Sequence, residues 1–433
     1  LIQSETQLEG GQLHRIEETQ RQTSSCPVLF AWDGTKYAFV TDLLGVGGVG
    51  FWVAPGVYAP PAPHETLLLP AGLLQPRGNE LALKLGEPME ESCYLDGAVL
   101  DALDVPPGWH VTVDDRMAVE GPAPTGKIVF YRESVTPSRA VDQAGRDVRA
   151  ALLHTDLKAA PAAELDPRFI GRTQEQVLTL EFERALDDGP GQPVRIADGW
   201  IEYPYAQTMF AAWQADAAYE APTIEARGAD GAWTVVLRQY GYPAGMPRES
   251  SVPLRGLPQG ARALRIRTTQ EIYWDRLAVA WAEDCAEARV TQLPLTSSKL
   301  AYVGFAKRTT APQRLPHYDY TQRAPLWDAR YQAGFHTRFG PVDELVEATD
   351  DAVVIFGPGE EVDLRFRAPT KPVPSGWARR YVLRTTGWCK DMDLCTLDGE
   401  TVGPLPVRAE DGKAHPARAR LHGRYQTRYR AGR

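Results

Sequence analysis

A chain of 433 residues is too long for one ordinary hydrophobic core, so we expect two or three domains. Hydrophobic residues make up 43% of the chain, and 38 Gly and 35 Pro favour many turns and short strands over long helices. The net charge of −9 argues against a general nucleic-acid binder, and no apolar run approaches the roughly 20 residues of a membrane-spanning helix.

The N-terminal residues 1–24 are polar, with only a faint helical spacing of apolar side chains. The chain begins at Leu1 rather than Met and lacks the basic and then apolar pattern of a signal peptide. We therefore expect a processed or truncated product, in which residues 1–24 are a linker or the end of a missing upstream domain.

Residues 25–160 are expected to form an N-terminal β domain. Its clearest hairpin joins residues 27–32 to 35–41 around Asp33-Gly34, a pair that tolerates the positive φ of a tight turn. The glycine-rich stretch GVGGVG at 45–50 has dinucleotide-loop spacing, but prolines rather than a helix follow it. We expect a flexible loop there, able to cover a ligand or a partner.

Residues 161–290 are expected to form a jelly-roll-like β-sandwich. The segment VLTLEFE at 177–183 alternates apolar and polar side chains, as a half-buried strand does. Further strand-like segments follow at the fairly regular spacing typical of sandwiches. Residues 208–216 could make one helical turn.

Residues 291–408 are expected to form a C-terminal β domain. A hairpin joins residues 352–356 to 361–367, and a strand at 379–384 lies between two Gly-Trp pairs. An acidic loop follows that strand. Residues 409–433 contain seven Lys or Arg, which we interpret as a basic tail that is solvated or lies on an acidic neighbour, with a docking arm as the alternative.

The five cysteines form no CxxC motif, so zinc ribbons and thioredoxin-like sites have no local support. Cys389 and Cys395 enclose five residues, which would suit a disulfide in an oxidising compartment. Cys26 and Cys93 could pair across a sheet. An odd number leaves at least one thiol free or bonded between chains.

The best local carboxylate cluster lies beside those cysteines and is a candidate Ca²⁺ site, since Ca²⁺ prefers six to eight oxygen ligands. Its members are Asp391, Asp393, Asp398 and Glu400. Their spacing is not that of an EF-hand, because Cys395 stands where an oxygen ligand would be. A solvated turn is the competing interpretation. The eight scattered histidines leave open a zinc or copper site built from distant His.

Few residues point to catalysis. The chain has no GxSxG, HExxH, P-loop or SxxK motif. Glu271 and Asp275 flank Tyr273-Trp274 as a glycosidase pair could, but on a strand they would lie about 13 Å apart, too far to act together. We therefore assign no catalytic residue.

Aromatic side chains in turn-like segments are candidate binding residues, because the apolar face of a sugar stacks on such rings and protein partners use them as anchors. The candidates are Trp52, Tyr203, Tyr205, Tyr242, Tyr318, Tyr320 and Trp327.

Several strings in fixed order resemble a C-terminal region of large secreted bacterial proteins. They include CPVLFAWDGTKYAFVTD at 26–42, GWIEYPYAQ at 199–207, RIRTTQEIYWDRL at 265–277 and GWCKDMD at 387–393. In those proteins the region follows an FG-GAP β-propeller with an ASPIC/UnbV segment, of the cartilage-acidic-protein type, or tetratricopeptide repeats. The middle part also resembles a galactose-binding-like jelly roll. The resemblance implies an extracytoplasmic region and carries over no activity.

The sequence thus predicts an all-β protein of two or three β-sandwiches, jelly-roll or immunoglobulin-like, with aromatic-rich connectors and few short helices. We expect a secreted or cell-surface, non-enzymatic module that binds a protein partner or assembles with copies of itself. A carbohydrate-binding module is the first alternative, and a glycan-active hydrolase or lyase is the second. No nucleic-acid partner and no membrane span are expected.

Overall fold

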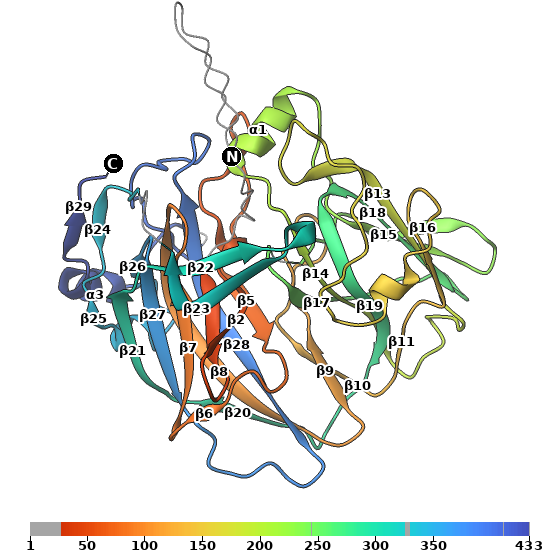
Figure 1. Ribbon diagram of the computed structural model, residues 1–433, viewed down its shortest axis with the longest axis horizontal. Helices are drawn as coiled ribbons and strands as arrows, with labels where there is room; N and C mark the ends of the chain where they lie inside the picture. Colours follow the sequence, from red (N-terminus) through yellow and green to blue (C-terminus); the bar gives the residue numbers. More distant parts are fainter. Residues whose placement is uncertain (1–26, 244, 325–329, 410, 433) are drawn as a thin grey trace, which may run out of the picture.

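Two β-sandwiches lie side by side in the computed structural model, as Figure 1 shows. The structure describes residues 27–243, 245–324, 330–409 and 411–432. Antiparallel strands dominate both sandwiches, so the predicted all-β sandwich fold is confirmed. No helix among the described residues is long and apolar enough to cross a membrane.

The first unit, which we call the split sandwich, is built from both ends of the described chain. One sheet has the order β2 (Tyr37–Asp42), β1 (Val28–Trp32), β7 (Glu80–Gly86), β27 (Glu360–Arg367), β21 (Leu295–Tyr302) and β25 (Gly340–Pro341), with β6 (Pro76–Arg77) beside β7. The other has the order β20 (Arg289–Leu293), β8 (Glu91–Val105), β28 (Ala378–Asp391) and β5 (His64–Leu68), with β26 (Val354–Phe356) beside β8.

This topology differs from the expected separate domains at 25–160 and 291–408, because strands of both stretches share the same two sheets. The apolar positions of β7 stand opposite those of β27: Leu81, Leu83 and Leu85 face Phe366, Leu364 and Val362. All six side chains are buried in one core. Neither stretch could bury these faces alone, so the two form one unit.

The second unit, the inserted sandwich, lies between these two stretches in sequence. One sheet has the order β11 (Ser134–Val135), β19 (Ile272–Ala282), β14 (Gln192–Ile201) and β17 (Arg248–Pro253). The other has the order β12 (Arg139–Val141), β13 (Arg172–Glu181), β18 (Ala263–Gln270), β15 (Thr223–Arg227) and β16 (Trp233–Leu237). The predicted alternation is found, since Leu178, Leu180, Leu264 and Ile266 are all buried.

A short hairpin, β9 (His110–Val113) and β10 (Ile128–Tyr131), fills the space between the two sandwiches. Ile128 and Phe130 pack with the split sandwich, whereas Val129 and Tyr131 pack with the inserted one. Alternate side chains of a strand point to opposite faces. The hairpin therefore fastens the two units together.

Short elements complete the fold. The remaining strands are β3 (Trp52–Ala54), β4 (Val57–Tyr58), β22 (Phe305–Thr310), β23 (Pro316–Ala324), β24 (Gly334–His336) and β29 (Arg428–Arg430). The helices are α1 (Ala206–Gln214), α2 (Asp343–Val346), α3 (Ala417–Tyr425) and the 3₁₀ turns η1 (Gly45–Gly47), η2 (Arg149–Leu152) and η3 (Pro312–Arg314). The turn expected near 208–216 is α1.

The GVGGVG stretch is a packed turn rather than the expected flexible loop. No α-helix follows it, as predicted, and β3 comes next. A Cβ on Gly47 would lie 2.4 Å from the carbonyl oxygen of Gly387, and Val49 N donates to Cys389 O at 2.9 Å. The glycines thus allow this segment to lie directly against β28.

The basic C-terminal segment is folded onto the split sandwich. Helix α3 buries Leu421 and Tyr425 in the main core, and β29 pairs with β24. Arg424 pairs with Glu344, and Arg428 pairs with the fully buried Glu360. We expected this segment either to be solvated, to lie on an acidic neighbour or to be a docking arm. The structure shows it lying on an acidic neighbour.

Candidate functional site

An exposed apolar surface lies where the two sandwiches meet, and we call it the junction patch. It comprises Trp52, Val57 and Tyr58 of the β3–β4 hairpin, Phe210 and Trp213 of α1, and Leu394 and Leu397 of the loop after β28. Leu394 is 87% exposed and Trp213 is 50% exposed. Large apolar side chains gathered in this way on a protein surface mark interaction sites.

Ring contacts and backbone hydrogen bonds hold the junction patch together. The rings of Trp52 and Phe210 are stacked, with centroids 6.3 Å apart, and Phe210 contacts Trp213 at 5.5 Å. Trp52 N donates to Cys395 O at 2.9 Å, and Gln207 N donates to Asp393 Oδ2 at 3.1 Å. Because each segment is tied to another, the patch is formed before any partner arrives.

The three chain segments that form the patch together carry acidic side chains but no basic ones. Residues 45–63, 203–219 and 391–405 contain no Lys or Arg. Asp216, Asp398 and Glu400 in these segments are exposed. The surroundings of the patch therefore favour a partner that carries positive charge.

A polar cleft of about 400 Å³ lies elsewhere on the split sandwich, against β5, β8 and β28. Its walls include His64, Thr66, Thr349 and Thr386, and His64 Nδ1 lies 2.9 Å from Thr386 Oγ1. No aromatic side chain of Phe, Tyr or Trp is among the described residues that line it. The cleft offers hydrogen bonds to a small polar molecule but no ring on which a sugar could stack.

A group of buried charges joins the sandwiches, and we call it the junction ion cluster. Two of its members, Glu65 and Asp115, also line the cleft. Arg248 of the inserted sandwich donates to Glu65 Oε1 of β5 at 2.9 Å. Arg248 Nη2 lies 3.8 Å from Asp42 Oδ1, and Asp115 completes the set. Burial raises the pKa of Asp42 to about 6 and that of Asp115 to about 7, and the Glu65 carboxylate adds to both shifts.

The junction ion cluster should make stability depend on pH through Asp115. Below pH 4 both the folded and the unfolded chain hold the Asp115 proton. As pH rises from 4 to 7, the unfolded chain releases this proton while the folded chain still holds it. The contribution of Asp115 to the free energy of unfolding therefore falls, by about 1.4 kcal/mol for each unit by which the folded pKa exceeds the unfolded pKa. Urea unfolding at pH 4.5–8 gives the free energies of unfolding of wild type and Asp115→Asn. The difference between these two free energies should change by several kcal/mol across this pH range.

The exposed Asp188→Asn is the control for that measurement and should run parallel to wild type. An Asp115→Asn curve that also runs parallel would show that Asp115 is not a buried acid with a raised pKa.

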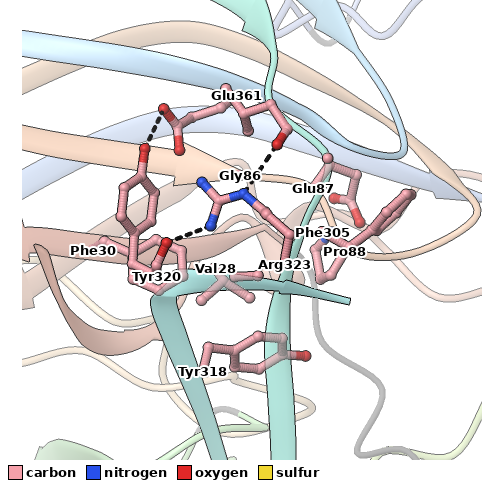
Figure 2. A pocket seen from close by; sticks show the side chains of 13 residues that line it. Val28, Phe30, Gly86, Glu87, Pro88, Phe305, Tyr318, Tyr320, Arg323 and Glu361 are labelled. Carbon is pink, nitrogen blue, oxygen red and sulfur yellow. Dashed lines mark hydrogen bonds between the residues drawn. The ribbon is translucent and has the colours of Figure 1, made fainter. Parts of the chain in front are cut away.

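The predicted residues Tyr318 and Tyr320 lie on β23, which packs with β22 over the first sheet of the split sandwich. Figure 2 shows them around a small cavity beside Phe30 and Glu361. Tyr320 donates to Glu361 Oε1 at 3.1 Å, and Tyr318 is buried. The cavity measures about 20 Å³, room for about one water molecule. These rings fill the space between elements.

The other predicted aromatic residues are dispersed. Tyr203 and Tyr242 contact each other edge to face at 6.3 Å and pack with the core of the inserted sandwich. Tyr205 caps α1, and burial raises the pKa of its hydroxyl well above the usual range. Trp327 lies outside the described residues. Of the predicted set, the structure therefore places only Trp52 in the junction patch among the residues that it describes.

The disulfide expected between Cys389 and Cys395 is not present, and that prediction is wrong. Strand β28 continues through Cys389 to Asp391, because it pairs along nearly its whole length with the long β8. Cys389 therefore stands opposite Cys93 inside a sheet, rather than at the start of a turn. The suggested partner of Cys93, Cys26, lies outside the described residues.

The expected Ca²⁺ cluster is not assembled among the described residues. Asp391 hydrogen-bonds to Glu91, whereas Asp393 accepts from Cys395 N at 2.7 Å and from Gln207 N. Asp398 and Glu400 are exposed. Local spacing placed the four carboxylates together, but the extension of β28 turns Asp391 toward β8 and leaves the others in a turn.

Glu271 and Asp275 each have a structural partner. Tyr273 Oη donates to Glu271 Oε1 at 2.6 Å, and Arg314 also pairs with Glu271. Asp275 accepts backbone N–H groups from residues 156–158 at 3.0–3.4 Å. These contacts fit the structural interpretation of both carboxylates.

Sequence reasoning missed Phe210, Trp213, Leu394 and Leu397 of the junction patch. Leu394 had a signal, since an apolar residue within the acidic stretch DMDLC is out of place in a solvated turn. Phe210 and Trp213 lie three apart, the spacing of one helix face, in a segment where we expected a helical turn.

Comparisons with known proteins do not establish a family. No family model matches the chain, and no curated protein matches it. Solved structures that match include infectious bursal disease virus, Gt strain, at 10% identity and a TM-score of 0.12, covering 84% of this chain and 77% of that one. The Gx strain matches at 10% identity and a TM-score of 0.11, covering 85% and 78%. Such low scores support no argument about fold or function.

Proposed function

We propose that the protein is a non-enzymatic interaction module that binds a protein partner through the junction patch. The observation that carries this proposal is the exposure of Leu394, Trp213 and their neighbours around the stacked rings of Trp52 and Phe210. Trp and Leu side chains that are half or more exposed cost solvation unless a partner covers them. Hydrogen bonds among the three segments support a preformed site, which lowers the entropic cost of binding.

The partner that we propose presents apolar anchors flanked by Lys or Arg. The acidic side chains near the patch and the lack of basic residues in its three segments favour such a partner over one with an acidic rim. The polar cleft offers no ring for a stacked sugar among its described lining residues. The resemblance to regions of large secreted bacterial proteins supports an extracytoplasmic setting.

The double variant Trp213→Ser/Leu394→Ser tests the proposal with a defined probe. The probe is a synthetic peptide with Trp and Leu anchors flanked by Lys, paired with a twin in which every Lys is Glu. We expect the basic peptide to bind wild type more tightly than its twin, and the double variant to lose tenfold or more in affinity by calorimetry. Leu394 is 87% exposed and Trp213 is 50% exposed, so the unfolding midpoint should fall only slightly, through the lost ring contact with Phe210.

Val290→Ser is the matched control, because Val290 is 53% exposed on β20, outside the patch. It should bind the basic peptide as wild type does. Equal binding by the double variant, or equal binding of the two peptides, would contradict the proposal. Self-association of wild type that disappears in the double variant, measured by sedimentation velocity, would instead make the patch a contact between copies.

A further inference from the structure

A second feature, unrelated to the junction patch proposal, gathers metal-binding side chains on one face of a strand pair. In the register of β8 and β28, Glu91 stands opposite Asp391 and Cys93 stands opposite Cys389. Residues two apart on a strand share a face, so these four side chains point to the same side. Glu87 lies just before β8 and joins them there.

The distances between the ligand atoms of Glu87, Glu91 and Cys93 are short enough for one metal ion to bind all three. Cys93 Sγ lies 3.0 Å from Glu87 Oε2 and 3.7 Å from Glu91 Oε1. One ligand atom from each of the three residues lies within 4.8 Å of the others, and all three side chains are buried. In a tetrahedral zinc site, bonds of about 2.0 Å to oxygen and 2.3 Å to sulfur place ligand atoms about 3.5 Å apart.

The buried carboxyls of this group have no cation partner, unlike two other buried carboxyls of the split sandwich. Glu360 pairs with Arg428, and Glu65 pairs with Arg248. In the part of the chain that the structure describes, neither Lys nor Arg forms an ion pair with Glu87, Glu91 or Asp391. A buried charge must be paired, protonated or bound to a metal.

The nearest basic side chain in sequence, Lys390, donates to Gly403 O at 2.8 Å and so does not neutralise these carboxyls. A divalent cation could supply the missing positive charge.

We propose that Glu87, Glu91 and Cys93 bind a zinc ion. A thiolate beside two carboxylates favours Zn²⁺ over the harder Ca²⁺ and Mg²⁺, which prefer oxygen ligands alone. Asp391, hydrogen-bonded to Glu91 from the opposite strand, orients that carboxylate. Binding displaces the Cys93 thiol proton, because zinc binds the thiolate.

Glu87 also lines the small cavity of Figure 2, whereas Glu91 and Cys93 do not. Its size, about 20 Å³, would admit a water molecule but not a hydrated ion. We therefore expect zinc to enter during folding rather than by diffusion into the folded chain.

The test is to refold the full chain in zinc or in chelator, desalt it, and measure bound metal by mass spectrometry. Wild type refolded in zinc should retain about one ion per chain and melt at higher temperature than the chelator sample. Cys93→Ser and Glu91→Gln should lose both the ion and the shift in melting. Cobalt in place of zinc should give the near-ultraviolet absorption of a cobalt–thiolate bond, absent in Cys93→Ser.

Cys395→Ser is the control, since Cys395 is a thiol in the turn after β28 and belongs to no ligand group among the described residues. It should keep the ion. Glu91→Gln retains hydrogen-bonding capacity, and its melting in chelator checks that it folds. The proposal is overturned if wild type retains no zinc, if Cys93→Ser retains as much as wild type, or if peptide mapping shows Cys93 in a disulfide with Cys389.

Discussion

Replacing Arg248 with Met should lower the free energy of unfolding at pH 8 by about 3–5 kcal/mol. Arg248 is nearly buried at the junction of the sandwiches, where it pairs with Glu65 and lies 3.8 Å from Asp42. Asp115 lies close enough to interact with it electrostatically. Methionine fills similar space but leaves three buried carboxyls without their cation. Urea unfolding of wild type and Arg248→Met gives the difference directly.

The effect of Arg248→Met should shrink at pH 5. The pKa of Asp42 is about 6 and that of Asp115 about 7, so both are largely protonated there and need the guanidinium less. Arg267→Met is the control, since Arg267 pairs with Glu175 at the surface, and it should cost less than about 1 kcal/mol at both pH values. A loss of that small size for Arg248→Met, or one that is equal at pH 5 and pH 8, would argue against the role assigned to this cation.

Leu421→Ala should lower the free energy of unfolding by about 2–5 kcal/mol, although Leu421 lies in a segment with the composition of a solvated tail. Its side chain is 2% exposed and packs in the main core of the split sandwich. Alanine would leave a cavity between α3 and the sheets. Thermal or urea unfolding of the full chain measures this loss.

Arg420→Ala provides the comparison at the adjacent position. Arg420 is exposed and lies 3.9 Å from Glu344, so its removal should change stability by about 0.5 kcal/mol or less. Equal stabilities of Leu421→Ala and wild type would mean that α3 does not stay docked in solution.

Local sequence patterns predicted several of the strands correctly. Alternation in β13 and β18 correctly predicted which side chains are buried, because a strand that packs on one face repeats every two residues. The first hairpin formed around Asp33, whose carboxylate accepts from Thr35 N and Lys36 N at 2.8 Å. Each of these signals lies within about ten residues, and a single sequence holds that information.

Features that depend on pairing between distant segments could not be predicted from local sequence patterns. Nothing near β7 shows that its partner is β27, almost 300 residues later, so the split sandwich appeared as two domains. The acidic loop was misplaced for the same reason, because only the register with β8 shows that β28 continues to Asp391. Of the predicted site residues, Trp52 lies in the junction patch, whose other members come from two further segments.

The interleaved connectivity also has a consequence for biosynthesis. Strands β1, β7 and β8 leave the ribosome long before β20, β21, β27 and β28, with which they share sheets. The inserted sandwich is complete in sequence by Ala282 and is free to fold first. Until translation reaches β28, the apolar faces of the early strands stay uncovered, and such species are prone to aggregation. Slow decoding or chaperone capture in that interval would govern yield more than the final stability does.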